Sequence, residues 1–288
     1  YHVDVRCSDE IFQQLSQNYL KFRNTCKFCL DNLVGFDADR LVQPDELLPL
    51  DKWAVTRLNS LIEKVFAAYD NYEFHVVSHM INDFCVVDLS SFYFDIIKDR
   101  LYCGEENGLE RRSAQTAVWM ILDAMTRMFA PILAFTCDEV WLAMPHRAAD
   151  DARNVLFNEM VQPYAAYALS QEEMGRWARI AALRTAVNGA LEQARADKTI
   201  GKSLEAEVDL TVTAEDAFLT EMDADALADT LIVSQVRVDV GAAQAVAVRP
   251  ASGAKCLRCW KVLPTVGSDA QHPDLCPRCA AVVKKLPV

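Results

Sequence analysis

The sequence lacks the features that mark several large classes of protein. It contains no run of 18 uncharged apolar residues, so we expect no transmembrane helix. It starts without an initiator methionine and without a secretory signal peptide, which suggests a segment of a longer protein. Its nine glycines are scattered, and none forms a GxGxxG or P-loop pattern for nucleotide phosphates. An excess of basic charge is also missing, because the net charge of −12 argues against a surface coated for nucleic-acid binding.

Cysteine is plentiful, and its spacing separates one group from the rest. Cys256, Cys259, Cys276 and Cys279 form two C-x2-C pairs with sixteen residues between them, which is typical of a zinc ribbon. Four thiolates fill a tetrahedral site and leave no position for water, so we expect one structural zinc ion. The other six of the ten cysteines show no spacing of a secreted disulfide scaffold. This pattern predicts a reducing, cytoplasmic location.

A further C-x2-C pair, Cys26 and Cys29, invites the same interpretation but lies in a different setting. The segment over residues 10–34 has apolar residues at alternating steps of three and four, which predicts a helix. Both cysteines fall on that apolar seam, where cysteine behaves as a small hydrophobic residue. We therefore expect this pair to pack in a core.

The apolar spacing predicts a mainly α-helical protein, with an antiparallel helical bundle over residues 1–163. Asp51 is expected to cap the second helix of the bundle. Thr136 with Glu139 resembles a capping box at the start of a short helix. The other expected helical regions cover residues 10–34, 75–102 and 109–130.

The pattern changes after Pro163 and predicts a small α/β connector over residues 164–252. Ser170 and Glu173 resemble a capping box that opens a helix. Alternating apolar and polar residues then indicate strands. A zinc-ribbon-like module follows over residues 253–288. Within the connector we expect a strand at 206–213, a helix at 215–228 and strands at 231–240 and 244–249.

Basic residues are concentrated in two regions of this acidic chain. Residues 176–202 and residues 253–288 each carry six basic and two acidic residues, whereas residues 204–250 carry ten acidic and two basic ones. Contact with nucleic acid is therefore expected to be local. We predict that phosphates are bound by Arg195, Lys198 and Lys202.

The zinc module itself carries an aromatic residue among cations. Trp260 directly follows a cysteine of the first pair and lies between Arg258 and Lys261, and Arg278 lies within the second pair. A ring beside such groups suits an unpaired base and its phosphate. The alternative is that Trp260 covers the zinc site as the small core of the module.

Several motifs resemble a known family. The zinc stretch resembles the C-terminal zinc module of bacterial isoleucyl-tRNA synthetases, and a related finger occurs in formamidopyrimidine-type DNA glycosylases. The remaining motifs resemble only the synthetase, in its anticodon-binding bundle and connector. The zinc stretch comprises residues 255–260 (KCLRCW) and 272–279 (HPDLCPRC). The bundle motifs are residues 88–90 (DLS), 98–102 (KDRLY) and 130–136 (APILAFT), and the connector motif is residues 200–206 (IGKSLEA).

The resemblance implies the C-terminal part of a ligase that joins isoleucine to its tRNA with ATP. The implied partners are the anticodon stem-loop of isoleucine tRNA and the catalytic domain of the same enzyme, in a monomer without membrane contact. The HIGH-type and KMSKS-type signatures that bind ATP in this class are absent, and no editing domain is recognisable. We therefore expect no catalytic residues here and no activity of this chain alone.

Two other functions stay open at this point. The zinc module can be a structural appendage that does not touch RNA. It can also belong to a protein of the DNA glycosylase type, which should begin with a catalytic Pro-Glu and carry a basic cleft. The sequence begins with Tyr1 and His2 and has a net charge of −12, and so shows neither feature.

Overall fold

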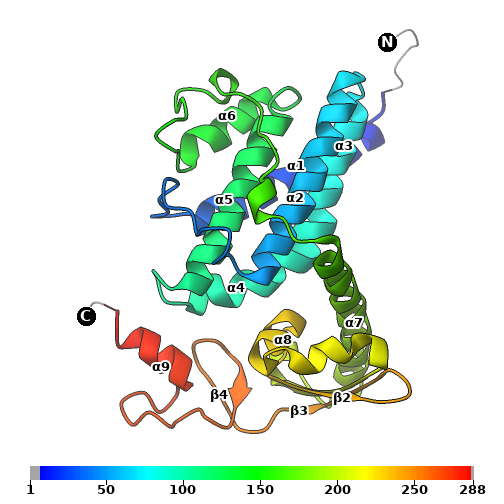
Figure 1. The fold of residues 1–288 in the computed structure, drawn as a ribbon, viewed down its shortest axis with the longest axis vertical. Coiled ribbons are helices and arrows are strands. Elements are labelled where there is room, and N and C mark those ends of the chain that lie inside the picture. Colours follow the sequence, from blue (N-terminus) through cyan, green and yellow to red (C-terminus); the bar gives the residue numbers. More distant parts are fainter. Residues whose placement is uncertain (1–6, 287–288) are drawn as a thin grey trace. The chain divides into compact units, whose positions relative to one another are not determined.

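The computed structural model describes residues 7–286 and divides into two compact units (Figure 1). The first unit comprises residues 7–97 and 106–169, and the second comprises residues 98–105 and 170–286. The second unit thus holds both the segment expected as a connector and the segment expected as a zinc module. The division into three domains stays a prediction.

The first unit is a bundle of helices, as the apolar spacing predicts. Its central helix, α5 (Leu109–Phe129), is buried at every position from Ser113 onward. A helix buried on all sides must be surrounded by other elements, and α5 packs against α1, α2, α3 and α6. The other elements are α1 (Asp9–Asn32), α2 (Pro49–Asp70), α3 (Phe74–Asp83), η1 (Phe84–Tyr93), α4 (Phe94–Cys103), α6 (Ala134–Ala143), η2 (Val155–Phe157) and η3 (Ala165–Tyr167).

The helical region expected over 75–102 contains an irregularity that periodicity did not reveal. Its middle, η1, is a π-helix of ten residues between α3 and α4. Within it Asp88 accepts two hydrogen bonds from Arg57, at 2.8 and 3.2 Å. The wider turn changes which side chains face the core, and so Val87 is exposed although it is apolar.

Cys26 and Cys29 lie in the core of the bundle, as predicted. Their side chains are 1% and 0% exposed. Burial raises the pKa of both thiols well above the usual value, because a thiolate would lose its hydration there. Since zinc binding and redox chemistry need the thiolate, this pair behaves as two small apolar side chains.

Two expected helix caps are wrong. Asp51 lies inside the first turn of α2, where it is buried and accepts hydrogen bonds from Tyr93 Oη at 2.7 Å and Ser113 Oγ at 2.5 Å. Thr136 lies inside α6, which begins at Ala134 without a side-chain cap. Its hydroxyl instead shares a 3.3 Å hydrogen bond with Tyr19. In both cases the side-chain oxygen forms its hydrogen bond with a residue distant in sequence and does not cap the helix.

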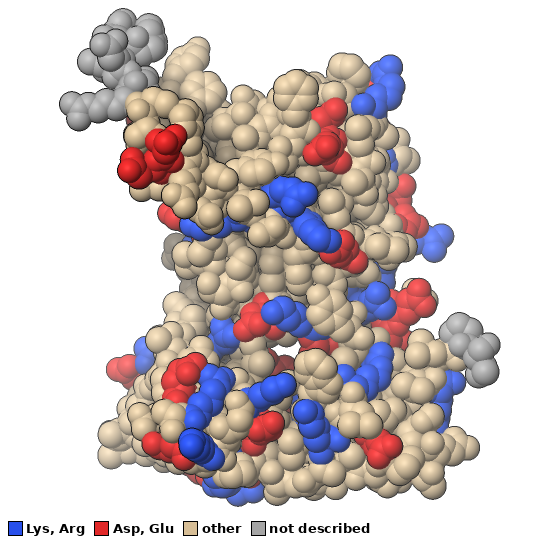
Figure 2. All heavy atoms as spheres, turned by 180° about the vertical axis from the view of Figure 1, so that it is seen from behind, with Lys and Arg blue, Asp and Glu red and all other residues tan. Residues whose placement is uncertain are grey.

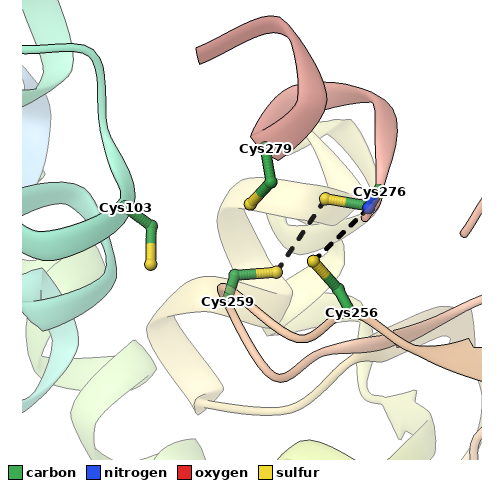
Figure 3. Close-up of a cluster of buried hydrophobic side chains, with 5 residues drawn as sticks. All are labelled: Cys103, Cys256, Cys259, Cys276 and Cys279. Atoms are coloured by element: carbon green, nitrogen blue, oxygen red, sulfur yellow. Dashed lines mark hydrogen bonds between the residues drawn. The ribbon is translucent and has the colours of Figure 1, made fainter. Parts of the chain in front are cut away.

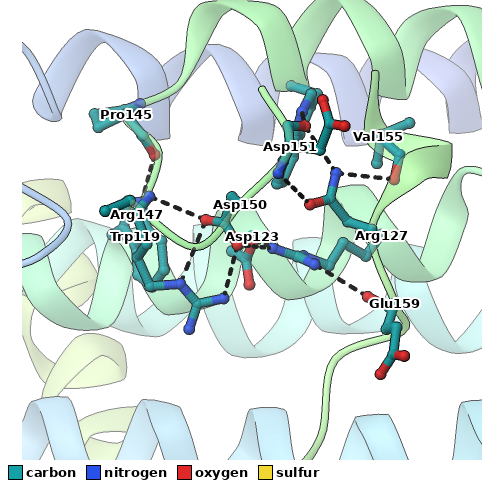
Figure 4. A network of polar contacts seen from close by, with 12 residues as sticks. Trp119, Asp123, Arg127, Pro145, Arg147, Asp150, Asp151, Val155 and Glu159 are labelled. Atoms are coloured by element: carbon teal, nitrogen blue, oxygen red, sulfur yellow. Dashed lines mark hydrogen bonds and ion pairs between the residues drawn. The ribbon is translucent and has the colours of Figure 1, made fainter. Parts of the chain in front are cut away.

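A buried ionic network ties the end of α5 to the loops that follow α6 (Figure 4). Arg127 donates to Asp123 and to Asp150, both at 2.8 Å, and to the carbonyl of Glu159 at 3.0 Å. Arg147 also donates to Asp150. Because Arg127 is 8% exposed, its charge depends on these acceptors in place of water.

Replacing Arg127 with alanine is expected to destabilise the bundle by about 3–5 kcal/mol, because the Asp123 carboxylate stays buried without its ion-pair partner, while Asp150 keeps Arg147. Arg153→Ala is the matched control. Its ion pair with Asp151 lies at the surface, where the arginine side chain is 79% exposed and water screens the charges, so its loss is expected to change the stability little. Urea unfolding followed by circular dichroism measures both. Equal midpoints for the two variants would contradict the prediction.

The longest helix of the second unit is α7 (Gln171–Ala196), and the capping box predicted at its start is confirmed. Ser170 Oγ accepts from the backbone N–H of Glu173, whose carboxylate accepts from the Ser170 N–H at 2.8 Å. A three-stranded sheet in the order β2-β1-β3 follows, with β2 parallel and β3 antiparallel to β1. Its elements are η4 (Ser203–Glu205), β1 (Ala206–Val212), η5 (Ala214–Glu221), α8 (Ala224–Leu231), β2 (Gln235–Val240) and β3 (Ala245–Pro250).

β1 and β3 lie within one residue of their expected bounds. The strand expected at 231–240 begins only at Gln235, because Leu231 ends α8, and the expected helix at 215–228 is divided into η5 and α8. The end of the chain adds a short hairpin and a helix: β4 (Ala254–Lys255), β5 (Val262–Leu263) and α9 (Pro277–Val283). Over residues 7–286, no helix is long and apolar enough to cross a membrane.

Candidate metal centre and nucleic-acid interface

The four cysteines of the two C-x2-C pairs come together in one cluster (Figure 3). Their sulfur atoms all lie within 4.8 Å of one another, and those of Cys259 and Cys276 are 3.9 Å apart. Zinc–sulfur bonds of about 2.3 Å in a tetrahedron place the sulfur atoms about 3.8 Å apart. The cluster therefore fits one zinc ion, and no other such group occurs among residues 7–286.

Local backbone geometry directs the sulfur atoms inward. The first pair lies on the β4–β5 turn, where the Trp260 N–H donates to the Cys256 carbonyl at 2.9 Å. The second pair opens α9, with Cys276 as the N-cap residue. The Cys276 N–H donates to Cys256 Sγ at 3.3 Å, and such bonds stabilise a sulfur that carries negative charge.

Charge around the cluster favours a thiolate at Cys279. A hydrogen bond from the Cys259 thiol lowers the pKa of Cys279, against burial, which raises it, and the same hydrogen bond raises the pKa of Cys259. Arg258 and Arg278 lower it further. Since zinc binds the deprotonated sulfur, this environment suits a metal ligand.

Two arginines of the zinc module are held by residues 98–105 of the same unit. Arg258 donates to the Cys103 carbonyl, and Cys103 packs beside the four cysteines (Figure 3). Arg278 donates to both carboxylate oxygens of Asp99, one of them at 2.9 Å. These cations therefore already have anionic or carbonyl partners, which a phosphate would have to displace.

Lys261 lies in the interior. Its side chain is 8% exposed and forms an ion pair with Asp229 of α8. The zinc module is anchored to the connector by this pair. We therefore leave Lys261 out of the proposed RNA contacts.

Trp260 has the opposite surroundings. It is 57% exposed and stands at the surface with a left-handed backbone conformation, φ +66°. A non-glycine residue in the left-handed region costs about 1–3 kcal/mol, which other interactions of the β4–β5 turn must offset. The ammonium groups of Lys202 and Lys255 lie 5.8 and 6.0 Å from the centre of its ring. An exposed ring beside two cations is the arrangement expected of a stacking platform.

A pocket of about 200 Å³ opens beside this ring. Trp260, Lys202 and Lys255 line it together with Glu205 and Ile232. The pocket therefore combines an aromatic face, two positive charges and one carboxylate. Sequence reasoning missed Lys255 and Glu205, although Lys255 precedes a cluster cysteine and Glu205 lies three residues after Lys202.

The other two predicted phosphate contacts lie at the end of α7. The Arg195 guanidinium already has two partners, because it donates to Ser203 Oγ at 2.6 Å and forms an ion pair with Glu192. Lys198 is exposed, and within residues 7–286 it has no ion-pair partner. It follows the α7 C-cap with φ +58°.

Charge elsewhere on the surface is mixed. On the face shown in Figure 2, Lys and Arg side chains alternate with Asp and Glu. This face therefore has no broad basic surface, in agreement with the net charge of −12. Contact with RNA is expected to depend on few positions.

Comparison with known proteins gives two family matches and many relatives. Residues 51–210 match the anticodon-binding domain of tRNA ligase, and residues 253–282 match the zinc finger found in FPG and IleRS. The isoleucine–tRNA ligase of Geobacter sulfurreducens is 43% identical over 99% of the chain and 32% of its own length. That of Dichelobacter nodosus is 42% identical over 97% of the chain and 30% of its own length.

The chain thus spans about a third of the length of the curated relatives it matches. The zinc-finger match and the cysteine cluster together support one structural zinc ion. The matched anticodon-binding region covers more than half of the chain and includes helices of the bundle and α7. The chain belongs to the anticodon-binding family of tRNA ligases, and it matches the C-terminal part of isoleucine–tRNA ligases.

Proposed function

We propose that this chain binds the anticodon stem-loop of isoleucine tRNA for a ligase that attaches isoleucine with ATP. The helical bundle holds the stem, and the surface around Trp260 contacts loop nucleotides. The observation that carries the proposal is the exposed ring of Trp260 beside Lys202 and Lys255. Unpaired loop bases have free faces that stack on such a ring, whereas duplex bases do not.

In this proposal zinc has a structural role. Cys256, Cys259, Cys276 and Cys279 are its ligands, and all four positions are taken by sulfur. The ion holds the β4–β5 turn in the conformation that presents Trp260. The aminoacylation chemistry and the use of ATP belong to the catalytic domain, so this chain alone is inactive. The proposal includes a cytoplasmic, monomeric enzyme.

The test is binding of the purified chain to a hairpin RNA with the anticodon stem-loop sequence of isoleucine tRNA. A second hairpin has the same stem and an altered anticodon. We expect tighter binding of the first hairpin. Equal binding of both would show that the chain does not recognise the anticodon.

Phosphate contacts are tested by salt dependence. Lys202→Ala and Lys255→Ala are each expected to reduce the slope of log K against log salt concentration by about 0.7–1, because one fewer counterion is released. Lys27→Ala is the control, since Lys27 is an exposed lysine of α1 paired with Asp31. An unchanged slope in the first two variants would identify both lysines as ordinary solvated charges.

A second function has its own support. Arg258, Arg278 and Lys261 all bind partners within the second unit. These contacts are what a zinc-stabilised structural appendage without RNA contact requires. Deletion of residues 253–288 separates the two functions, because unchanged hairpin affinity would favour the appendage.

A further inference from the structure

The pocket beside Trp260 contains a carboxylate that phosphate binding does not need. Glu205 lines this pocket with Lys202, Lys255 and the ring of Trp260. A negative side chain repels phosphate, so Glu205 is not a phosphate contact. Carboxylates accept hydrogen bonds and donate none when ionised.

Glu205 is held in a fixed position. Its Oε2 accepts the backbone N–H groups of Gly201 at 2.9 Å and Lys202 at 3.1 Å. These same N–H groups lower the pKa of Glu205, so the carboxylate is ionised at neutral pH. Its Oε1 accepts no hydrogen bond from residues 7–286 and is free for a ligand.

An acceptor next to a stacking ring discriminates among bases by their edges. The Watson–Crick edge of guanine has two adjacent donors, N1–H and the N2 amino group. Adenine and cytosine each have one amino group beside a ring nitrogen that accepts and therefore repels a carboxylate. Uracil has a single N–H between two carbonyl oxygens. Guanine is the base whose edge best matches an ionised carboxylate.

We infer that this pocket takes one unpaired guanosine nucleotide, with the base stacked on Trp260 and its edge read by Glu205. Lys202 and Lys255 lie within 6.0 Å of the ring centre, and so are placed to contact the flanking phosphates. Glu205 is thus a specificity-determining residue. The inference rests on the proposed RNA-binding function and adds the identity of one base.

The experiment uses RNA hairpins with one stem and a loop of uridines. A single guanosine is placed at each loop position in turn, and the dissociation constants are measured for the intact chain at one salt concentration. At the preferred position guanosine is then replaced with inosine, which lacks the N2 amino group, and with adenosine. We expect binding to weaken at least about fivefold with either replacement.

Glu205→Gln keeps an oxygen for the Gly201 and Lys202 N–H groups but removes the charge. It is expected to bring the guanosine and inosine hairpins to within about twofold of each other. Glu215→Gln is the matched control, because this exposed glutamate of η5 pairs with Arg179 and does not line the pocket. It should preserve the preference. Zinc content confirms that each variant is folded.

The outcomes separate the inference from the proposed function. If hairpins bind and Trp260→Ala weakens them, but guanosine, inosine and adenosine loops bind equally, the guanosine pocket is overturned and RNA binding stands. A guanosine preference that persists in Glu205→Gln overturns the role of Glu205. If no hairpin binds, the proposed function fails and the inference fails with it.

Discussion

Removal of zinc is expected to unfold residues 253–286 and to abolish the contribution of Trp260 to RNA binding. Beyond the four cysteines, the core of this module has few apolar residues, among them Leu263, Val266 and Leu275. Burial of so small a core does not offset the entropy of ordering the segment. Zinc binding supplies about 10–16 kcal/mol in comparable peptides, so the metal provides most of the folding free energy.

Chelation followed by Trp fluorescence and zinc analysis measures this effect. Cys276→Ser is expected to lose the zinc ion in the same way, because it removes one of four ligands. Cys7→Ser is the control, since Cys7 is an exposed cysteine outside the cluster. The helical signal of the first unit should persist in every case, because none of its residues is a predicted ligand. A Cys276→Ser variant that retains one zinc per chain would refute the assignment.

Replacing Trp260 with alanine is expected to weaken hairpin binding by about 1–3 kcal/mol, which is roughly 5- to 150-fold in the dissociation constant. The affinity is expected to fall because the substitution removes the surface on which a base stacks. Trp260 is 57% exposed, so most of its surface is available to a base. For the same reason, zinc content and thermal stability should change little. Alanine also has a Cβ, so the strain of the backbone at φ +66° is unchanged by this substitution.

Phe135→Ala is the matched control for Trp260→Ala. Phe135 is 92% exposed on α6 in the first unit, so it loses a similar aromatic surface without touching the zinc module. Its hairpin affinity should stay close to that of the unaltered chain. If Trp260→Ala instead loses zinc, Trp260 is a packing residue that covers the zinc site, and the stacking role is wrong.

The contrast between Trp260 and Lys261 shows what sequence spacing cannot decide. The two residues are adjacent, and both looked like parts of one RNA-contacting surface. Trp260 is exposed, whereas Lys261 is buried against Asp229, which lies 32 positions earlier in the chain. Neighbouring residues on a tight turn point in different directions, and only the tertiary fold determines what each one meets.

The same limit applies to helix caps. Ser170 and Glu173 form the predicted box because all its partners lie within three residues. Asp51 and Thr136 match a local cap signal equally well, but residues far away in sequence take their oxygen atoms. Local hydrogen bonds follow from sequence, whereas competition from distant partners does not.

By itself the sequence determined the helices of the bundle, the strands of the connector and the four cysteines of the zinc site. These features depend on periodicity and spacing, which are local properties. The tertiary structure alone decided that Lys255 and Glu205 share a pocket with Trp260, and that Arg258 and Arg278 turn towards residues 98–105. The contacts of Glu205, Arg258 and Arg278 join residues 55 to 179 positions apart, and only a packed fold brings such residues to one site.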